Sequence, residues 1–253
     1  MEKNKDFLDY ILHLADTQLI LAQRLSEWCG HGPVLEQDIA IDNMALDVLG
    51  QASYLYEYAA ELLGNGKTAD DLAMLRSERE FKNLLVVELP NGDFGQTVAR
   101  QFFFDAYFIL ILAELTKSPN STLAAIAEKA LKEAKYHLKW SSEWVIRLGD
   151  GTEESHQRMR NAVGELMPYL NELFIPAPYE LTLLEKGLVP DARTLKAQWL
   201  SHVRSVLAEA QLDFPWEEAV VQQGGKVGIH TEYLGYILAE MQYLQRSYPG
   251  LQW

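Results

Sequence analysis

Cysteine is almost absent from the chain: Cys29 is the single cysteine among 253 residues. One thiol cannot form a disulfide within the chain, and proteins without disulfides are typical of reducing compartments. The N-terminal residues enter an amphipathic segment with polar residues every few positions, which is not the pattern of a signal peptide. We therefore expect an intracellular, cytoplasmic protein.

Positive charge is also scarce, with 22 Lys and Arg against 36 Asp and Glu and a net charge of −14. Binding to a phosphate backbone or to an anionic membrane surface needs a positively charged face. Long apolar runs are missing as well, since none approaches the roughly 20 residues of a membrane span. We therefore expect neither nucleic acid nor membrane as a partner.

The alternating pattern of β-strands is missing, and apolar residues recur instead every three or four positions. Breaks rich in glycine and proline separate these segments. The expected helices cover approximately residues 7–28, 36–63, 69–81, 93–116, 119–148, 153–173, 191–211 and 231–248. Four long helices followed by shorter ones predict an all-α bundle in a single domain, residues 1–253.

Each of the four long helices places one polar residue in an apolar stripe: Asp16, Asp47, Asp105 and His137. The intervals between them are 31, 58 and 32 residues. Two hairpins of matched depth, joined by a longer crossover, produce this short–long–short pattern. The topology is that of a ferritin-like four-helix bundle, here with additional C-terminal helices.

The metal ligands that such bundles use are incomplete. A di-iron site needs a Glu-x-x-His motif on two of its helices. Gly50 stands three residues after Asp47, where the first histidine is needed, and Ala134 stands three residues before His137, where a carboxylate is needed. Glu133 is adjacent to Ala134 but faces about 100° away around the helix. The sequence therefore predicts a vestigial metal site that holds no metal.

A second interpretation of the four polar residues stays open. A single Asp or His in an apolar stripe is usually a core residue whose hydrogen bonds are satisfied within the protein. If these groups are buried without metal, we expect them to bond each other and the nearby Gln51 and Gln101, because an unpaired buried polar group costs about 1–3 kcal/mol.

One short stretch, residues 76–83, gathers three cations around an aromatic ring: Arg76, Arg79, Lys82 and Phe81. Cations beside an aromatic ring favour a phosphorylated, nucleotide-like group such as coenzyme A. The alternative is a solvated helix face whose cations pair with Glu78 and Glu80. The glycine-rich residues 224–228 follow no strand, so we interpret them as a loop, with phosphate binding as a weaker alternative. The common hydrolase, dinucleotide, P-loop and zinc-protease motifs are absent.

Several blocks of the chain resemble the C subunits of the bacterial phenylacetyl-CoA epoxidases. The blocks lie from one end of the chain to the other and are uncommon in other families. They are LSEWCGHGP at residues 25–33, LDVLGQA at 46–52, ELPNGDF at 88–94, EAKYHL at 133–138, LAEMQYLQR at 238–246 and PGLQW at 249–253.

The resemblance implies a ferritin-like structural subunit of a monooxygenase complex that epoxidises the ring of phenylacetyl-CoA during aerobic phenylacetate degradation. In this family a second, homologous subunit is catalytic and holds the di-iron centre. We refer to it as the di-iron subunit. A reductase with flavin and iron–sulfur groups delivers electrons from NADPH for reaction with O₂. The implied chain is non-catalytic, holds no cofactor and forms a heterodimer or larger hetero-oligomer with the di-iron subunit. The residues at positions 50 and 134 agree with that role.

The resemblance also implies that substrate coenzyme A lies near the contact with the di-iron subunit. By position, the resemblance adds two stretches to Arg76 as expected substrate-binding residues. They are Arg79, Glu80, Phe81 and Lys82, and then Glu180, Leu181 and Thr182. Two alternatives remain for the chain as a whole. The first is an autonomous di-iron oxygenase, which the ligand count disfavours, and the second is a stand-alone helical binding protein.

Overall fold

A computed structural model describes residues 2–216 and 220–251 of the chain. Gln252 and Trp253, from the last of the quoted blocks, lie outside the described residues. Within the described ranges every regular element is a helix and there is no strand. The all-α prediction is confirmed. Among these residues, no helix is both long enough and apolar enough to cross a membrane.

The helices fall close to the predicted ranges, with differences at some ends. The segment predicted to continue to residue 81 ends at Met74, and a short 3₁₀ turn follows. The α-helices are α1 Glu2–Ser26, α2 Leu35–Leu63, α3 Ala69–Met74, α4 Phe94–Leu115, α5 Ser121–Gly149, α6 Glu153–Leu170, α7 Pro178–Leu184, α8 Ala192–Glu209, α9 Glu232–Met241 and α10 Tyr243–Ser247. The 3₁₀ helices are η1 Glu78–Glu80, η2 Leu85–Val87, η3 Asn171–Phe174 and η5 Gly225–Val227.

The chain divides into two compact units. Unit 1 comprises Met1–Pro90, Ala177–Leu183 and Gly224–Trp253, and unit 2 comprises Asn91–Pro176 and Leu184–Gln223. Each unit contains one of the two predicted long hairpins, α1–α2 in unit 1 and α4–α5 in unit 2. The prediction of one ferritin-like domain over residues 1–253 stays a prediction.

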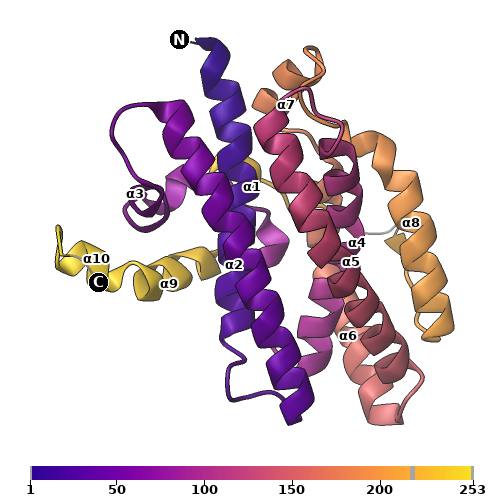
Figure 1. The fold of residues 1–253 in the computed structure, drawn as a ribbon. Helices are drawn as coiled ribbons and strands as arrows, with labels where there is room; N and C mark the ends of the chain where they lie inside the picture. Colours follow the sequence, from indigo (N-terminus) through magenta and orange to yellow (C-terminus); the bar gives the residue numbers. More distant parts are fainter. Residues whose placement is uncertain (1, 217–219, 252–253) are drawn as a thin grey trace. The chain divides into compact units, whose positions relative to one another are not determined.

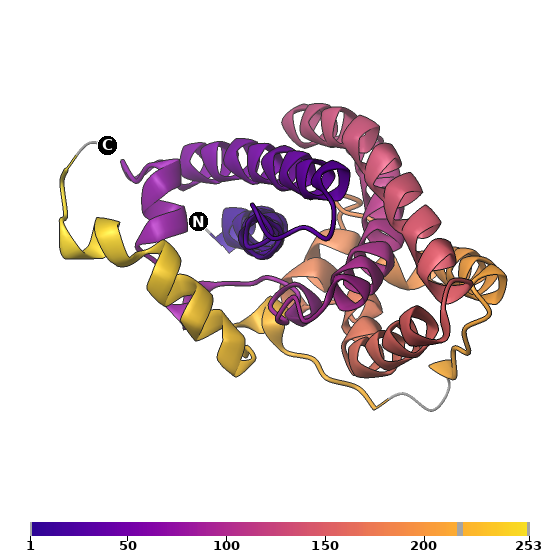
Figure 2. The same ribbon diagram turned by 90° about the horizontal axis from the view of Figure 1, so that it is seen from below.

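Unit 1 is organised around α1, which is buried along most of its length. Helix α2 packs along α1 (Figure 1), and the C-terminal helix α9 also contacts α1. Seen from below, α1 lies between α2 and the C-terminal helices (Figure 2). The turn into α2 is closed by Asp38, whose carboxylate accepts the backbone N–H groups of Gly30 and Gly32. A side chain at Gly32 would collide with the Asp38 backbone at 2.7 Å, so glycine is required there.

Unit 2 packs α6 and α8 against the α4–α5 hairpin around an aromatic core. Trp199 of α8 is fully buried, and its indole N–H donates to the carbonyl of Phe103 at 3.1 Å. The rings of Phe103, Phe174 and Phe214 all lie within 6.2 Å of the Trp199 ring, measured between centroids. This core holds α4, and with it Asp105, in place.

Candidate functional site

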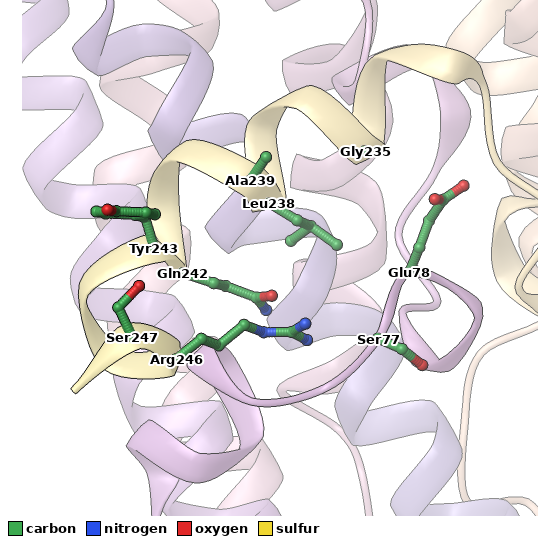
Figure 3. A pocket seen from close by; sticks show the side chains of 9 residues that line it. All are labelled: Ser77, Glu78, Gly235, Leu238, Ala239, Gln242, Tyr243, Arg246 and Ser247. Atoms are coloured by element: carbon green, nitrogen blue, oxygen red, sulfur yellow. The ribbon is translucent and has the colours of Figure 1, made fainter. Parts of the chain in front are cut away.

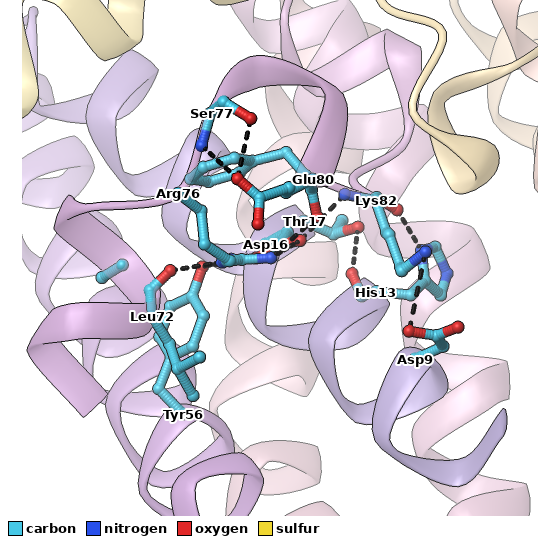
Figure 4. A network of polar contacts seen from close by, with 12 residues as sticks. Asp9, His13, Asp16, Thr17, Tyr56, Leu72, Arg76, Ser77, Glu80 and Lys82 are labelled. Carbon is cyan, nitrogen blue, oxygen red and sulfur yellow. Dashed lines mark hydrogen bonds and ion pairs between the residues drawn. The ribbon is translucent and has the colours of Figure 1, made fainter. Parts of the chain in front are cut away.

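The buried carboxylate of Asp16 forms the centre of a polar network in unit 1 (Figure 4). Its Oδ1 atom accepts the hydroxyl of Tyr56 at 2.6 Å, and Oδ2 accepts the backbone N–H of Lys82 at 2.8 Å. The guanidinium of Arg76 donates to both carboxylate oxygens, with Nη1 at 3.1 Å from Oδ2. Asp16 is therefore a fully hydrogen-bonded partner in a buried ion pair.

Arg76 is only 6% exposed, and its other donors also face protein acceptors. Nη1 donates to the carbonyl of Glu80 at 2.9 Å, and the guanidinium carbon lies 4.3 Å from the centre of the Phe81 ring. Burial is the largest influence on the pKa of Arg76 and lowers it, but the charge of Asp16, its hydrogen bond to Arg76 and the nearby Tyr56 together outweigh burial and raise the pKa above its ordinary value. The guanidinium of Arg76 is thus directed into unit 1.

The other predicted residues of this stretch have different environments. Arg79 and Glu80 are exposed, whereas Phe81 is fully buried. Lys82 is half-buried, with Nζ 3.6 Å from a carboxylate oxygen of Asp9. The Glu80 carboxylate accepts the backbone N–H of Ser77 at 2.8 Å, and this bond contributes to a lowered pKa. Arg76 is buried and bonds the backbone carbonyl of Glu80, not its carboxylate. The alternative of a solvent-exposed helix face, with Arg76 in a surface ion pair with Glu80, therefore does not describe this segment.

The second predicted stretch contains another buried ion pair. Glu180 of α7 lies with its Oε2 atom 3.1 Å from Nζ of Lys226, and both residues are buried. Burial is the largest influence on the pKa of Glu180 and raises it, but the charge of Lys226, the nearby His13 and the hydrogen bonds to Glu180 together outweigh burial and lower the pKa below its ordinary value. Leu181 is 42% exposed and Thr182 is half-buried. Only these last two side chains of the stretch reach the surface.

The structure brings the two stretches together within unit 1. The Lys82 ammonium lies 5.5 Å from the centre of the Tyr179 ring, which precedes Glu180. His13, a residue that the sequence analysis missed, lies between them and bonds the Lys82 carbonyl through Nδ1 at 2.7 Å. Burial, with the charge of Lys226, lowers the pKa of His13 to about 4. The imidazole is therefore neutral near pH 7, with its proton on Nδ1.

The glycine-rich loop at residues 224–228 packs closely against this site. A Cβ atom on Gly225 would lie 2.2 Å from the carbonyl oxygen of Asn83, and one on Gly228 would lie 2.4 Å from that of Arg79. Gly228 also has a positive φ of 81°. These glycines therefore allow the loop to approach residues 79–85 and to deliver Lys226 to Glu180.

A second missed cluster surrounds Glu88, which is fully buried. His230 contacts it through Nδ1 at 2.5 Å, and the other ring nitrogen lies 2.9 Å from the carbonyl oxygen of Phe81. Thr231 donates its backbone N–H and hydroxyl to the same carboxylate, at 2.8 and 2.6 Å. Because a carbonyl and a carboxylate only accept, both ring nitrogens of His230 carry protons. Burial lowers the pKa of His230, but its bonds to Glu88 and Phe81 outweigh burial and raise it.

Asp105 is the buried carboxyl of unit 2, and it bonds neutral groups. Its two oxygens lie 2.7 Å from Nε2 of Gln101 and 2.8 Å from Oγ of Ser141. Burial raises the pKa of Asp105 to about 8, so the group is mostly protonated near pH 7. Ser141 Oγ also lies 3.3 Å from the Leu138 carbonyl. A protonated Asp105 donates to Ser141, which then donates its own single proton to Leu138.

The remaining predicted positions are His137, which is buried on α5, and Asp47, which is half-buried on α2. The expected bond between Gln101 and a buried carboxyl is confirmed at Asp105. Within residues 2–216 and 220–251, no three His, Cys, Asp or Glu side chains are grouped as metal ligands. That the chain binds no metal stays a prediction.

A surface pocket of about 340 Å³ lies where α9 and α10 meet residues 77 and 78 (Figure 3). Two of its lining side chains hold the backbone of Arg76. Nε2 of Gln242 donates to the Arg76 carbonyl at 3.1 Å, and Nη2 of Arg246 donates to it at 2.8 Å. The C-terminal helices therefore fix the segment that supplies the cation to Asp16.

The sequence profile of the phenylacetic acid catabolic protein family matches residues 1–253. The chain belongs to this family. It is also similar to the C subunit of the 1,2-phenylacetyl-CoA epoxidase of Escherichia coli strain K12, with 50% identity over 244 residues. That alignment covers 96% of this chain and 98% of the relative. The resemblance inferred from the sequence blocks is confirmed.

Proposed function

We propose that this member of the family is the non-catalytic structural subunit of a phenylacetyl-CoA epoxidase, which packs against the di-iron subunit of that enzyme and stabilises it. The observation that carries the proposal is the 50% identity, over 96% of the chain, to a protein named as the C subunit of a phenylacetyl-CoA epoxidase. The missing ligands at Gly50 and Ala134 support the non-catalytic part of the proposal.

The chemistry of the two buried aspartates also supports a non-catalytic role. Metal ligands must be deprotonated and must offer free lone pairs. Asp16 already accepts bonds from Arg76, Tyr56 and the Lys82 backbone. Asp105 has its two oxygens beside the amide of Gln101 and the hydroxyl of Ser141. Both carboxyl groups therefore already have hydrogen-bond partners within the protein.

The test combines metal analysis with reconstitution. We expect the purified chain to contain almost no iron after anaerobic loading, to co-purify with the di-iron subunit, and to be required for epoxidation of phenylacetyl-CoA with the reductase present. About two irons per chain would make it an autonomous oxygenase and contradict the proposal. A stable monomer or homodimer that does not bind the di-iron subunit would identify a stand-alone binding protein and contradict it as well.

We further propose that the surface of unit 1 around residues 79–82 and 181–182 contributes to the site for the substrate's coenzyme A. The contact between Lys82 and the Tyr179 ring, which joins the two stretches, supports this assignment. Arg79, Lys82, Leu181 and Thr182 reach the surface and are the side chains that would touch the ligand. Arg76, Phe81 and Glu180 are buried and position them.

The assembled complex tests this second proposal. A charge-assisted hydrogen bond contributes about 1.5–3 kcal/mol, so Arg79→Gln with Lys82→Gln should raise KM for phenylacetyl-CoA roughly tenfold or more while kcat stays unchanged. Lys139→Gln, at an exposed lysine of α5, is the matched control and should leave KM unchanged. An unaltered KM in the double variant would contradict the assignment.

A further inference from the structure

Helix α2 has an apolar stripe on the side that faces away from α1. Its residues Leu35, Ile39, Leu46 and Leu49 are 70%, 51%, 65% and 39% exposed. At about 100° per residue these four positions share one side of the helix, roughly opposite the buried Met44 and Val48. The stripe extends over 14 positions, which is about 21 Å at ~1.5 Å per residue. These four side chains are not part of the core of unit 1.

The charge of α2 restricts what can cover this stripe. The 29-residue helix contains six carboxylates and no Lys or Arg. At the same helical spacing, Asp42 lies within the stripe, Asp38 borders one edge, and Glu36 and Asp47 lie beyond the other edge. A second copy of α2 would add six further carboxylates and no cation, which opposes pairing of the chain with itself. The acidic rim therefore favours Lys and Arg on the covering surface.

Gly50 gives an independent indication that a helix approaches this face. Glycine in the middle of a helix is destabilising relative to alanine, so it needs a reason. Gly50 does not have a positive φ, and none of the described residues lies within 4 Å of a Cβ atom placed there. The fold of this chain therefore does not require glycine at position 50. A close-packed partner helix supplies the missing reason, because a small residue lets two backbones approach.

We infer that the stripe of α2, formed by Leu35, Ile39, Leu46 and Leu49 with Gly50 beside it, is the docking face for a helix of the di-iron subunit. That helix has apolar residues rimmed by Lys and Arg. The inference rests on the proposed function, which supplies the partner, and adds the location and the charge of the contact. Aliphatic side chains supply the apolar contact, and the carboxylates select a basic partner.

The first experiment measures binding of the full-length chain to the purified di-iron subunit. Ile39→Gln with Leu46→Gln should weaken Kd at least tenfold, and the exposed positions should leave the fold intact. Tyr136→Gln, at a 52% exposed residue of α5, is the control and should bind like the wild type. A double variant that binds normally would overturn the location. Failure of the wild type to bind the di-iron subunit would instead refute the proposed function.

Gly50→Ala distinguishes a docking role from a structural one. The substitution should raise the Tm of the isolated chain, because alanine favours the helix and has free space. It should at the same time weaken Kd for the di-iron subunit several-fold, since the added methyl group separates the helices. A variant that gains stability without losing affinity would overturn the close approach at Gly50.

The salt dependence of Kd tests the predicted charge of the partner. Replacing the exposed Glu36, Glu57 and Glu61 by Gln should weaken binding and flatten its dependence on ionic strength. The same change at three exposed carboxylates of unit 2 is the control, at Glu128, Glu153 and Glu165. An unchanged salt slope would overturn the basic rim. Self-association of the wild-type chain that Leu46→Gln abolishes would assign the stripe to a second copy and overturn the inference.

Discussion

Asp16 and Asp105 occupy corresponding places in the two units, yet they are stabilised in different ways. Each is a buried carboxyl on the first helix of a long hairpin. Each lies next to a hydroxyl from the second helix, Tyr56 at 2.6 Å in unit 1 and Ser141 at 2.8 Å in unit 2. What differs is the third partner. Unit 1 brings a guanidinium to its carboxylate, whereas unit 2 brings the neutral amide of Gln101.

The difference shows that the segments packed against a hairpin decide the charge of its buried carboxyl. Burial in a medium of low polarity disfavours the ionised form unless a cation compensates. In unit 1 the segment after α3 places Arg76 against Asp16, and the pair is ionic. In unit 2 the hydrogen-bond partners of Asp105 are neutral, and burial raises its pKa to about 8. Two similar hairpins thus contain a salt bridge and a neutral acid.

The largest effect is expected from removing the cation of unit 1. Arg76→Met leaves Asp16 as a buried charge without its partner, and breaking such a pair costs about 3–5 kcal/mol. The free energy of unfolding, measured by urea denaturation at pH 7, should fall by that amount. Arg193→Met removes an exposed arginine that pairs with Asp191 and should leave stability almost unchanged.

A double-mutant cycle shows whether the loss belongs to the pair. Adding Asp16→Asn to Arg76→Met removes the stranded charge, so the double variant should recover a large part of the lost stability. If the double variant is as unstable as the sum of the two single variants, Asp16 and Arg76 do not act as a pair, and the contrast between the units disappears.

The helices and the burial of both aspartates follow from the sequence because they depend on local spacing. Apolar neighbours one turn away place Asp16 and Asp105 on the inner faces of their helices. The partner of Asp16 could not be found in this way, since Arg76 lies 60 residues further along the chain. Among neighbouring glutamates, Arg76 has the pattern of a surface cation. Only the packing of residues 75–82 turns it inward.

A similar limit applies to the candidate site. The stretch around Arg79 was selected from its cations and aromatic ring and then by resemblance, whereas the stretch around Glu180 was selected by resemblance alone. The sequence could not show that the two meet. Lys226, which pairs with Glu180, comes from a loop 46 residues away. One signal was available locally, because His13 precedes Asp16 by three residues and so shares its helix face. Long-range ion pairs have no periodic signature in the chain.

An intermediate effect is expected at Glu88, because its cationic partner His230 loses its charge as pH rises. The pKa of His230 is raised in the folded state. The stabilisation of the fold by protonated His230 is therefore complete below the ordinary histidine pKa of about 6.5 and is lost as pH rises through the folded-state pKa. A hydrogen bond to a charged group contributes about 1.5–3 kcal/mol. His230→Gln should therefore cost about 2 kcal/mol at pH 6 and progressively less at higher pH.

His13 provides the contrasting control for that measurement. Its pKa is lowered to about 4, mainly by burial, so the neutral form is the stabilising one. Its contribution is present above about pH 6.5 and is lost as pH falls toward 4. The free energy of unfolding is measured for wild type, His230→Gln and His13→Gln across pH 4–9. The difference between wild type and His230→Gln should grow as pH falls, and the difference between wild type and His13→Gln should grow as pH rises. Parallel curves would show that neither imidazole changes its protonation on unfolding.

The smallest effect is expected from replacing Asp105 by its neutral isostere, asparagine. At Asp105 the asparagine amide can donate to Ser141 and its carbonyl can accept from Gln101, as the protonated acid does. Because the folded-state pKa is about 8 and the ordinary value is 3.8, the stabilisation from protonated Asp105 is complete below about pH 4 and is lost as pH rises through 8. Asp105→Asn should therefore change stability by less than about 1 kcal/mol at pH 5 and exceed the wild type at pH 9.

The same substitution at Asp16 should have the opposite sign, because asparagine there leaves Arg76 as a buried cation without its carboxylate. Measured side by side, Asp16→Asn destabilises the chain at every pH above 5, whereas Asp105→Asn stabilises it as the medium becomes alkaline. A loss of stability in both variants at pH 9 would mean that the folded protein stabilises the ionised form of Asp105 and that its pKa is not raised by burial. The two units would then treat their buried carboxyls alike, and a cation near Asp105 would have to be sought.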